Sequence, residues 1–234
     1  MLGLQMPEEG GRVILYHAIG TNIPEDTQGR YNLSPNMFAA QMEWLAETGK
    51  CVELLARVNS GVAITFDDGY RDNFTVAYPI LKRLGLPFTI FVIPRFVESE
   101  RKGYLSKDDL RLLAADSMVT IGSHGDSHER LTGLSDSALM LELEQSKSWL
   151  EGVTRKPVTA LSYPHGAVDS RVRAAVAAAG FTLACTSEFG ANEADRDSLA
   201  LRRIDIWNTD DEAKFKSKLA GEWDWMCFFT RCGL

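Results

Sequence analysis

The 234-residue sequence lacks the long apolar runs and the basic leader that mark membrane and secreted proteins. No stretch approaches the ~18 consecutive apolar residues of a transmembrane helix, so we expect none. The N-terminal segment has no basic region followed by a long apolar one, the pattern of a secretory signal. As it stands, the sequence predicts a cytoplasmic protein, or a secreted one if a signal peptide has been removed.

Cysteine is also scarce, and basic residues are fewer than acidic ones. Four cysteines occur without a CxxC pair, which favours reduced thiols over a disulfide framework or a structural zinc site. The formal net charge of −7 argues against partners such as nucleic acid or anionic membranes, but not against neutral sugars. No Pro/Gly-rich linker or fixed-period repeat divides the chain, so we expect one domain over residues 1–234 with its core in residues 12–220. The oligomeric state stays open.

Short apolar runs alternate with amphipathic segments along the chain. The patterns predict strands at 12–17, 62–66, 87–93, 118–122, 158–164, 181–186 and 199–207, and helices at 34–50, 73–85, 106–117, 135–153, 169–180 and 210–221. Pro79 should kink or divide the second of these helices. Alternating strands and helices indicate an α/β fold with a parallel sheet, and apolar strands indicate that both sheet faces are covered. We favour a single barrel-like domain of about seven βα units over an open doubly wound sheet.

Polar residues gather directly after the expected strands. All four histidines of the chain do so, as do two adjacent carboxylates, the segment 162–166 and the segment 205–207. Ligand and catalytic sites of parallel α/β folds lie at the carboxyl ends of the strands. We therefore expect these residues to form one site.

The segment "ITFDDGY" places Asp67 and Asp68 side by side at the end of a strand. Neighbouring strand residues face opposite sides, so both carboxylates reach one site only where the chain turns, and Gly69 permits a turn. A divalent cation would relieve their repulsion: one carboxylate binds it and the other remains an ionised base. The alternative is an Asx turn or helix cap.

Two further segments contain candidate metal-binding or catalytic residues. "GSHGDSH" spaces His124 and His128 by four residues, which on a helical turn places both imidazoles on one face, as in two-histidine zinc sites. Two histidines and one carboxylate are a common ligand set for catalytic zinc, although unrelated histidines share this spacing. "SYPHG" contains Pro164 and Gly166, which predict a rigid loop that could direct a backbone N–H at an oxyanion, or an ordinary turn.

In this order, "TFDDG", "SHxxxH" and "YPxG" resemble the polysaccharide deacetylase family, whose NodB-homology domain is also called carbohydrate esterase family 4. The resemblance extends from "ILYHAIG" to "LRRIDI", and "YPxG" with the early "YH" resembles the branch that contains exopolysaccharide N-deacetylases. It implies a distorted (β/α)7 barrel and an acetylated glycan as substrate. It also implies a divalent metal, usually zinc (Zn2+), with Co2+, Ni2+ or Mn2+ serving some members.

The resemblance also implies roles for individual residues. Asp67 matches the catalytic base. The metal ligands would be Asp68, His124 and His128. The loop Tyr163, Pro164, His165 and Gly166 matches the loop that contacts acetate, with the His165 backbone N–H as oxyanion donor. The implied reaction is hydrolysis of an acetamide, which releases acetate and leaves an amine.

Two positions depart from the family pattern. Ser162 stands where many members have an arginine that orients the base, and no histidine follows His165 to serve as the usual general acid. We expect Arg203 to replace the missing arginine beside Asp67. His17 is our candidate for the general acid or for a supporting partner, against a purely structural role.

Aromatic residues near the strand ends suggest sugar contacts. Tyr104 and Trp207 could present their faces to sugar rings, although ordinary packing also explains them. The sequence thus predicts a metal-dependent carbohydrate N-deacetylase. The alternatives are an O-acetyl esterase, which the same metal and base could serve, and a catalytically weak carbohydrate-binding remnant.

Overall fold

A computed structural model describes residues 10–23, 26, 29–48, 52, 55–57 and 61–227. Its centre is a seven-stranded sheet in the order β8-β7-β6-β5-β4-β1-β9, in which every pair is parallel. The strands are β1 Arg12–Tyr16, β4 Val62–Phe66, β5 Phe88–Val92, β6 Val119–Ser123, β7 Ala160–Ser162, β8 Leu183–Cys185 and β9 Ile204–Asp205. A small parallel pair, β2 Ala18–Ile19 and β3 Asn32–Leu33, lies apart from this sheet.

The segment after β8 brings the two edges of the sheet together. Leu201 forms a parallel bridge to Cys185 of β8, and three residues later Ile204 pairs with Ile14 of β1. The chain therefore crosses from one edge strand to the other within 201–205. This near-closure agrees with the expected distorted (β/α)7 barrel in a single domain.

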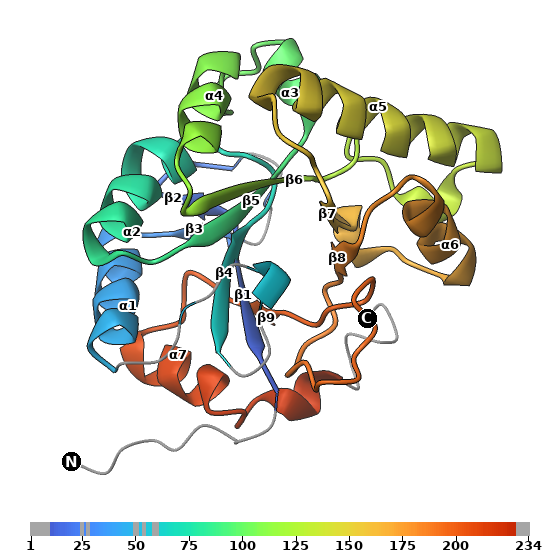
Figure 1. The fold of residues 1–234 in the computed structure, drawn as a ribbon. Helices are drawn as coiled ribbons and strands as arrows, with labels where there is room; N and C mark the ends of the chain where they lie inside the picture. The colour runs from blue at the N-terminus through green and yellow to red at the C-terminus, as the bar shows by residue number, and fades with distance from the viewer. Residues whose placement is uncertain are drawn as a thin grey trace.

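Helices surround the curved sheet (Figure 1). They are α1 Pro35–Glu47, α2 Tyr78–Leu84, α3 Pro94–Glu98, α4 Lys107–Ala115, α5 Asp136–Thr154, α6 Ser170–Ala178 and α7 Glu212–Leu219. Strands β1, β4 and β5 are buried along their whole length, because helices cover one face and the barrel interior the other. None of the helices in the described ranges is long and apolar enough to cross a membrane.

Most expected elements are present. The helix expected at 73–85 is divided into a π-helical turn, Asn73–Ala77, and α2, with Pro79 at the start of the second part as anticipated. The last strand is much shorter than 199–207, because the segment leaves one sheet edge before joining the other. Helix α3 was not expected, since five residues carry too little periodicity to detect.

Gly122 on β6 is a packing requirement, and it supports the strand end that carries His124. A Cβ added at Gly122 would lie 2.5 Å from the buried ring of Phe91 and 3.0 Å from the carbonyl oxygen of Ala160. We expect Gly122→Ala to lower the free energy of unfolding by about 1–3 kcal/mol, the usual cost of overpacking a core. Urea denaturation would measure this loss.

Gly152 in α5 offers the matched control for that substitution. An added Cβ there meets no atom within 4 Å, and alanine is the better helix former. Gly152→Ala should therefore keep or raise the urea midpoint. Equal midpoints for Gly122→Ala and the unaltered protein would contradict the packing argument.

Candidate active site

The carboxyl ends of the strands open onto a cavity of about 560 Å³. All four histidines and both adjacent carboxylates line it, as the strand-end argument predicted. The lining includes His17, Asp67, Asp68, His124, His128 and His165, together with Tyr163 and Gly166 of the expected loop. The sheet thus brings together residues from four chain segments.

A left-handed turn after β4 aims both carboxylates into this cavity. Asp68 and Gly69 have φ values of 70° and 76°, and the Gly69 N–H donates to the Asp67 carbonyl at 2.9 Å. Glycine adopts such values readily, whereas Asp68 does so with strain. From the sequence, the turn was expected at Gly69 alone, whereas Asp68 itself also adopts the left-handed conformation.

Asp67 is held by a buried arginine and a buried serine. The Arg203 guanidinium donates from Nη1 and Nη2 to the two carboxylate oxygens at 2.8 and 2.7 Å. Ser162 Oγ also donates to Asp67 Oδ2 at 2.9 Å, and it accepts from Arg203 Nη2 at 2.9 Å. Burial alone would raise the pKa of Asp67, but the Arg203 charge outweighs it and lowers that pKa, so the carboxylate is ionised near neutral pH.

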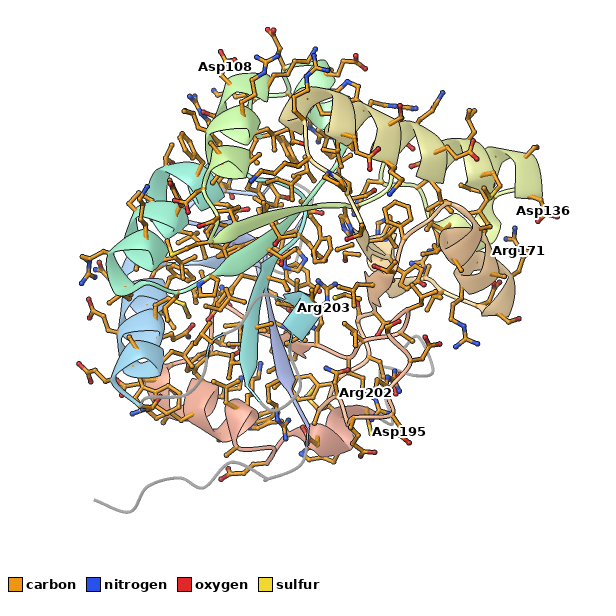
Figure 2. All side chains as sticks on the ribbon, in the orientation of Figure 1. Asp108, Asp136, Arg171, Asp195, Arg202 and Arg203 are labelled. Carbon is orange, nitrogen blue, oxygen red and sulfur yellow. The ribbon has the colours of Figure 1, made fainter. Side chains whose placement is uncertain are left out.

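The position of Arg203 follows from the barrel closure. Residues 201–205 cross between the sheet edges, and the Arg203 side chain lies in the centre of the fold (Figure 2). The side chain is 1% exposed, and Nε donates to the Thr186 carbonyl at 2.9 Å. The structure therefore places Arg203 beside Asp67, where the sequence argument expected a substitute for the family's arginine.

His124 and His128 meet on a loop and not on a helical turn, which corrects the sequence expectation. Residues 124–130 form no helix, and His128 has a left-handed φ of 68°. His124 Nδ1 lies 2.8 Å from the Ser162 carbonyl oxygen and donates to it, which leaves Nε2 facing Asp68 Oδ1 at 3.4 Å. The loop geometry brings the imidazole centroids to 4.9 Å from each other.

These two histidines and Asp68 fit a divalent cation. One ligand atom from each residue lies within 4.8 Å of the others, and Asp68 Oδ1 is 3.4 Å from Nε2 of both histidines. That oxygen is buried without a hydrogen-bond partner among the described residues. Burial and the neighbouring His124 lower the pKa of His128 to about 4, so it is neutral near pH 7, the form that binds metals.

The loop after β7 supports the same corner of the cavity. Its residues Pro164–Gly166 form a single 3-10 turn in which His165 has a left-handed φ of 57°. The His165 ring packs at a tilt against His128, with centroids 4.4 Å apart, and its Nε2 lies 3.1 Å from the His128 carbonyl oxygen. A Cβ on Gly166 would lie 2.6 Å from Ser187 Oγ, so only glycine fits there. The loop after β7 is therefore in direct contact with His128.

His17 lines the cavity together with Asp205, a residue that the sequence placed at a strand end without a role. The His17 ring packs at a tilt against Tyr31, with centroids 4.3 Å apart, and the His17 carbonyl accepts a hydrogen bond from Asn73. Its buried Nδ1 and the buried Asp205 Oδ1 both lack a hydrogen-bond partner among the described residues. Burial raises the pKa of Asp205, while the nearby His17 opposes that rise.

The two candidate sugar contacts, Tyr104 and Trp207, differ in their position relative to the cavity. Tyr104 lines the cavity and stacks on Tyr70, with ring centroids 4.9 Å apart. Trp207 is not among the residues that line it. Its ring lies against Lys218, 4.4 Å from the centroid, and its Nε1 donates to Asp205 at 2.7 Å. The structure thus gives Trp207 a packing position behind Asp205.

Glu142 on α5 is a supporting residue that sequence reasoning missed. Its Oε1 accepts from the Ser127 N–H at 2.6 Å and from Ser127 Oγ at 3.0 Å, which fixes the loop between the two histidines. The available signal was a carboxylate on the buried face of an amphipathic helix, where an unpaired charge would be costly. Only the fold shows which loop it supports.

Comparisons with known proteins agree with this site. A sequence model of the family described as polysaccharide deacetylase matches residues 57–184. The chain is 29% identical over 205 residues to YxkH of Bacillus subtilis (strain 168), a provisional polysaccharide deacetylase, covering 83% of this chain and 70% of that protein. It is 26% identical over 160 residues to the poly-beta-1,6-N-acetyl-D-glucosamine N-deacetylase of Staphylococcus aureus (strain MRSA252). That match covers 59% of this chain and 55% of the staphylococcal protein.

Solved structures show the same fold. A polysaccharide deacetylase from Bacillus cereus superposes with a TM-score of 0.81 at 27% identity, covering 91% of this chain and 69% of that one. The Streptococcus pyogenes deacetylase PplD, solved in complex with acetate, also gives a TM-score of 0.81, at 23% identity, and covers 91% and 99% of the two chains. Since the family model spans more than half of this sequence, the chain belongs to the polysaccharide deacetylase family.

Proposed function

We propose that this chain is a metal-dependent N-deacetylase that removes acetyl groups from acetamido sugars of a polysaccharide or carrier-linked glycan. One observation carries the proposal. An ionised carboxylate, Asp67, lies beside a candidate Asp/His/His cation site, with Asp67 Oδ2 only 3.9 Å from Nε2 of the ligand His124. A base next to a cation site suits hydrolysis of an unreactive amide.

Asp68, His124 and His128 would hold the cation, for which we propose Zn2+ with Co2+, Ni2+ or Mn2+ as substitutes. When bound, the cation would polarise the acetamide carbonyl and acidify water. Asp67 accepts the proton of the water that attacks this carbonyl. Arg203 holds both oxygens of Asp67, which keeps the base ionised and aimed at one point.

The remaining residues handle the oxyanion and the leaving group. The His165 backbone N–H, at the 3-10 turn, donates to the oxyanion that forms when water adds to the carbonyl. The C–N bond then breaks, acetate leaves, and His17 delivers a proton to the departing amine. Asp205, whose buried Oδ1 has no hydrogen-bond partner among the described residues, lies near His17 on the same side of the site.

Acetate release with controlled metal content tests this function. The metal-stripped protein would be titrated with each of the four cations and assayed on N-acetylglucosamine oligomers and on an O-acetylated glycan. Metal-dependent acetate release from the oligomers supports the proposal. Release from the O-acetylated glycan alone would indicate an esterase, bound metal without any release would indicate a binding module, and absence of metal binding would refute the site.

His17→Gln should lower turnover of an acetamido sugar by about 100-fold or more, the usual contribution of a general acid. The matched measurement uses 4-nitrophenyl acetate, whose leaving group departs without a proton. If His17 is the acid, the substitution should have a much smaller effect on this ester. Equal losses on both substrates would contradict the acid role and indicate a structural one.

Arg203 acts through Asp67 and is a positioning residue. Arg203→Gln leaves the buried Asp67 charge without its partner, which should lower the free energy of unfolding by about 3–5 kcal/mol and lower kcat at unchanged metal content. Arg203→Lys keeps the positive charge but cannot form the bidentate contact with Asp67, so it should retain part of kcat. The assay compares kcat, metal content and thermal midpoint. A kcat that is equal in both variants and in the unaltered protein would contradict this role.

A further inference from the structure

The two proposed histidine ligands are held in different ways. The His124 N–H donates to the Val92 carbonyl at 2.9 Å, which continues the pairing of β6 with β5, and the His124 ring donates to the Ser162 carbonyl at 2.8 Å. His128 lies four residues later on a loop without helix or strand, and its φ of 68° is strained for a residue other than glycine. Such a conformation persists only where neighbouring groups hold it. The position of His128 therefore depends on the contacts of its loop.

Glu142 of α5 provides a buried contact to this loop. Its Oε1 accepts a hydrogen bond from the Ser127 N–H at 2.6 Å, and Ser127 Oγ lies 3.0 and 3.1 Å from the two carboxylate oxygens. Ser127 directly precedes His128. Gly125 approaches the same carboxylate with a φ of 71°, and an added Cβ there would lie 3.0 Å from Glu142 Oε1. Glu142 thus fixes the chain within one residue of the second ligand.

The inner face of α5 is polar where it meets the loop. Glu142 is 7% exposed, and in the described part of the chain it forms no ion pair, so its hydrogen bonds go to Ser127. A carboxylate buried without a cation is costly unless hydrogen bonds satisfy it. One turn farther along α5, the buried Ser146 bonds Ser123 Oγ at 2.7 Å, and Ser123 Oγ accepts from the Gly125 N–H at 3.2 Å. Two buried polar groups of one helix therefore hold the loop.

The other contacts of the loop are more exposed. Arg95 pairs with Asp126 at 2.8 Å, but the Arg95 side chain is 60% exposed, and exposed ion pairs contribute little. His165 Nε2 lies 3.1 Å from the His128 carbonyl oxygen, and His165 is itself exposed. Of the three residues Arg95, His165 and Glu142, only Glu142 is buried. The contact to Ser127 is therefore the one that solvent competes with least.

We propose that Glu142 is a positioning residue of the cation site: it holds His128 in place before the cation binds, and it thereby sets the affinity for the cation. The inference rests on the Asp68, His124 and His128 site of the proposed function, and it assigns a role to a residue that is not one of the ligands. A site held in its binding geometry loses less conformational freedom when its ligand binds. Replacing groups behind metal ligands changes the affinity by about 10- to 100-fold.

Equilibrium dialysis against a Zn2+ buffer tests this role in three variants of the full chain. Glu142→Met keeps the approximate length and the helix propensity of the side chain but removes both acceptor oxygens. Glu142→Gln keeps one acceptor oxygen for the Ser127 N–H, so it is the rescue variant. Glu144→Met, at an exposed position of the same helix, is the matched control.

We expect Glu142→Met to weaken Zn2+ binding by about 10- to 100-fold, Glu142→Gln to recover most of the affinity, and Glu144→Met to leave it unchanged. Unaltered affinity in Glu142→Met, or equal losses in the Met and Gln variants, would overturn the proposal. Ser127→Ala keeps the test informative if Glu142→Met does not fold. It removes one of the two donors and should weaken Zn2+ binding by about two- to tenfold, the worth of one hydrogen bond, and an unchanged affinity would again contradict the role.

Hydrogen exchange of the metal-free protein tests whether the contact precedes the cation. The Ser127 amide should exchange slowly in the unaltered protein and rapidly in Glu142→Met, whereas rapid exchange in both would overturn the proposal. Affinity is measured without turnover, so absent acetate release with the expected Zn2+ affinities would refute only the deacetylase function. Absence of Zn2+ binding by the unaltered protein would refute both the cation site and the role of Glu142.

Discussion

Asp67→Asn should reduce acetate release by about 10²- to 10⁴-fold, the range for removal of a positioned general base. The amide cannot accept the proton of the attacking water, whereas its carbonyl oxygen can still accept a hydrogen bond from Arg203. Asp67 is not part of the Asp68/His124/His128 set, so the variant should bind metal as the unaltered protein does. Acetate release and metal content, measured on the same preparation, check both halves of the prediction.

The control for Asp67→Asn is Asp136→Asn at the start of α5. Asp136 also pairs with an arginine, Arg171 Nη1 at 2.9 Å, but at the surface, and Figure 2 shows this pair at the edge of the molecule. The control should release acetate at the unaltered rate. If Asp67→Asn lost its metal, or kept full activity, the assignment of Asp67 as the base and of Asp68 as the metal ligand would be wrong.

Asp68→Asn should weaken metal binding by more than about 100-fold, because even changes to groups behind the ligands cost 10- to 100-fold. The amide is a poor ligand where Asp68 Oδ1 faces two imidazole nitrogens at 3.4 Å. Activity should fall with metal occupancy and recover in part at high metal concentration. Equilibrium dialysis against a metal buffer would measure the change in affinity.

The same experiment separates binding from folding. Since Asp68 Oδ1 has no hydrogen-bond partner among the described residues, its replacement by an amide should change the thermal midpoint of the metal-free protein little. Added metal should raise the midpoint of the unaltered protein and not that of the variant. An Asp68→Asn protein that binds metal with unaltered affinity would exclude Asp68 as a ligand.

Much of the fold and of the site could be predicted from local patterns. Apolar runs such as 62–66 and 119–121 identify buried strands, because parallel strands covered on both faces need no polar alternation. Because the carboxyl ends of parallel strands meet at one edge of the sheet, Asp67, Asp68 and all four histidines could be predicted to line one site. The helical turn assumed for His124 and His128 was wrong, because spacing alone does not reveal a left-handed His128 held by a distant loop.

By itself, the sequence determined the alternation of strands and helices, the adjacency of Asp67 and Asp68, and the family resemblance. These depend on neighbouring residues and on periodicity. Only the tertiary structure decided that Arg203, 136 positions away, donates to both carboxylate oxygens of Asp67, and that Trp207 packs behind Asp205. Such contacts depend on how the barrel closes through residues 201–205, and no local propensity encodes that closure.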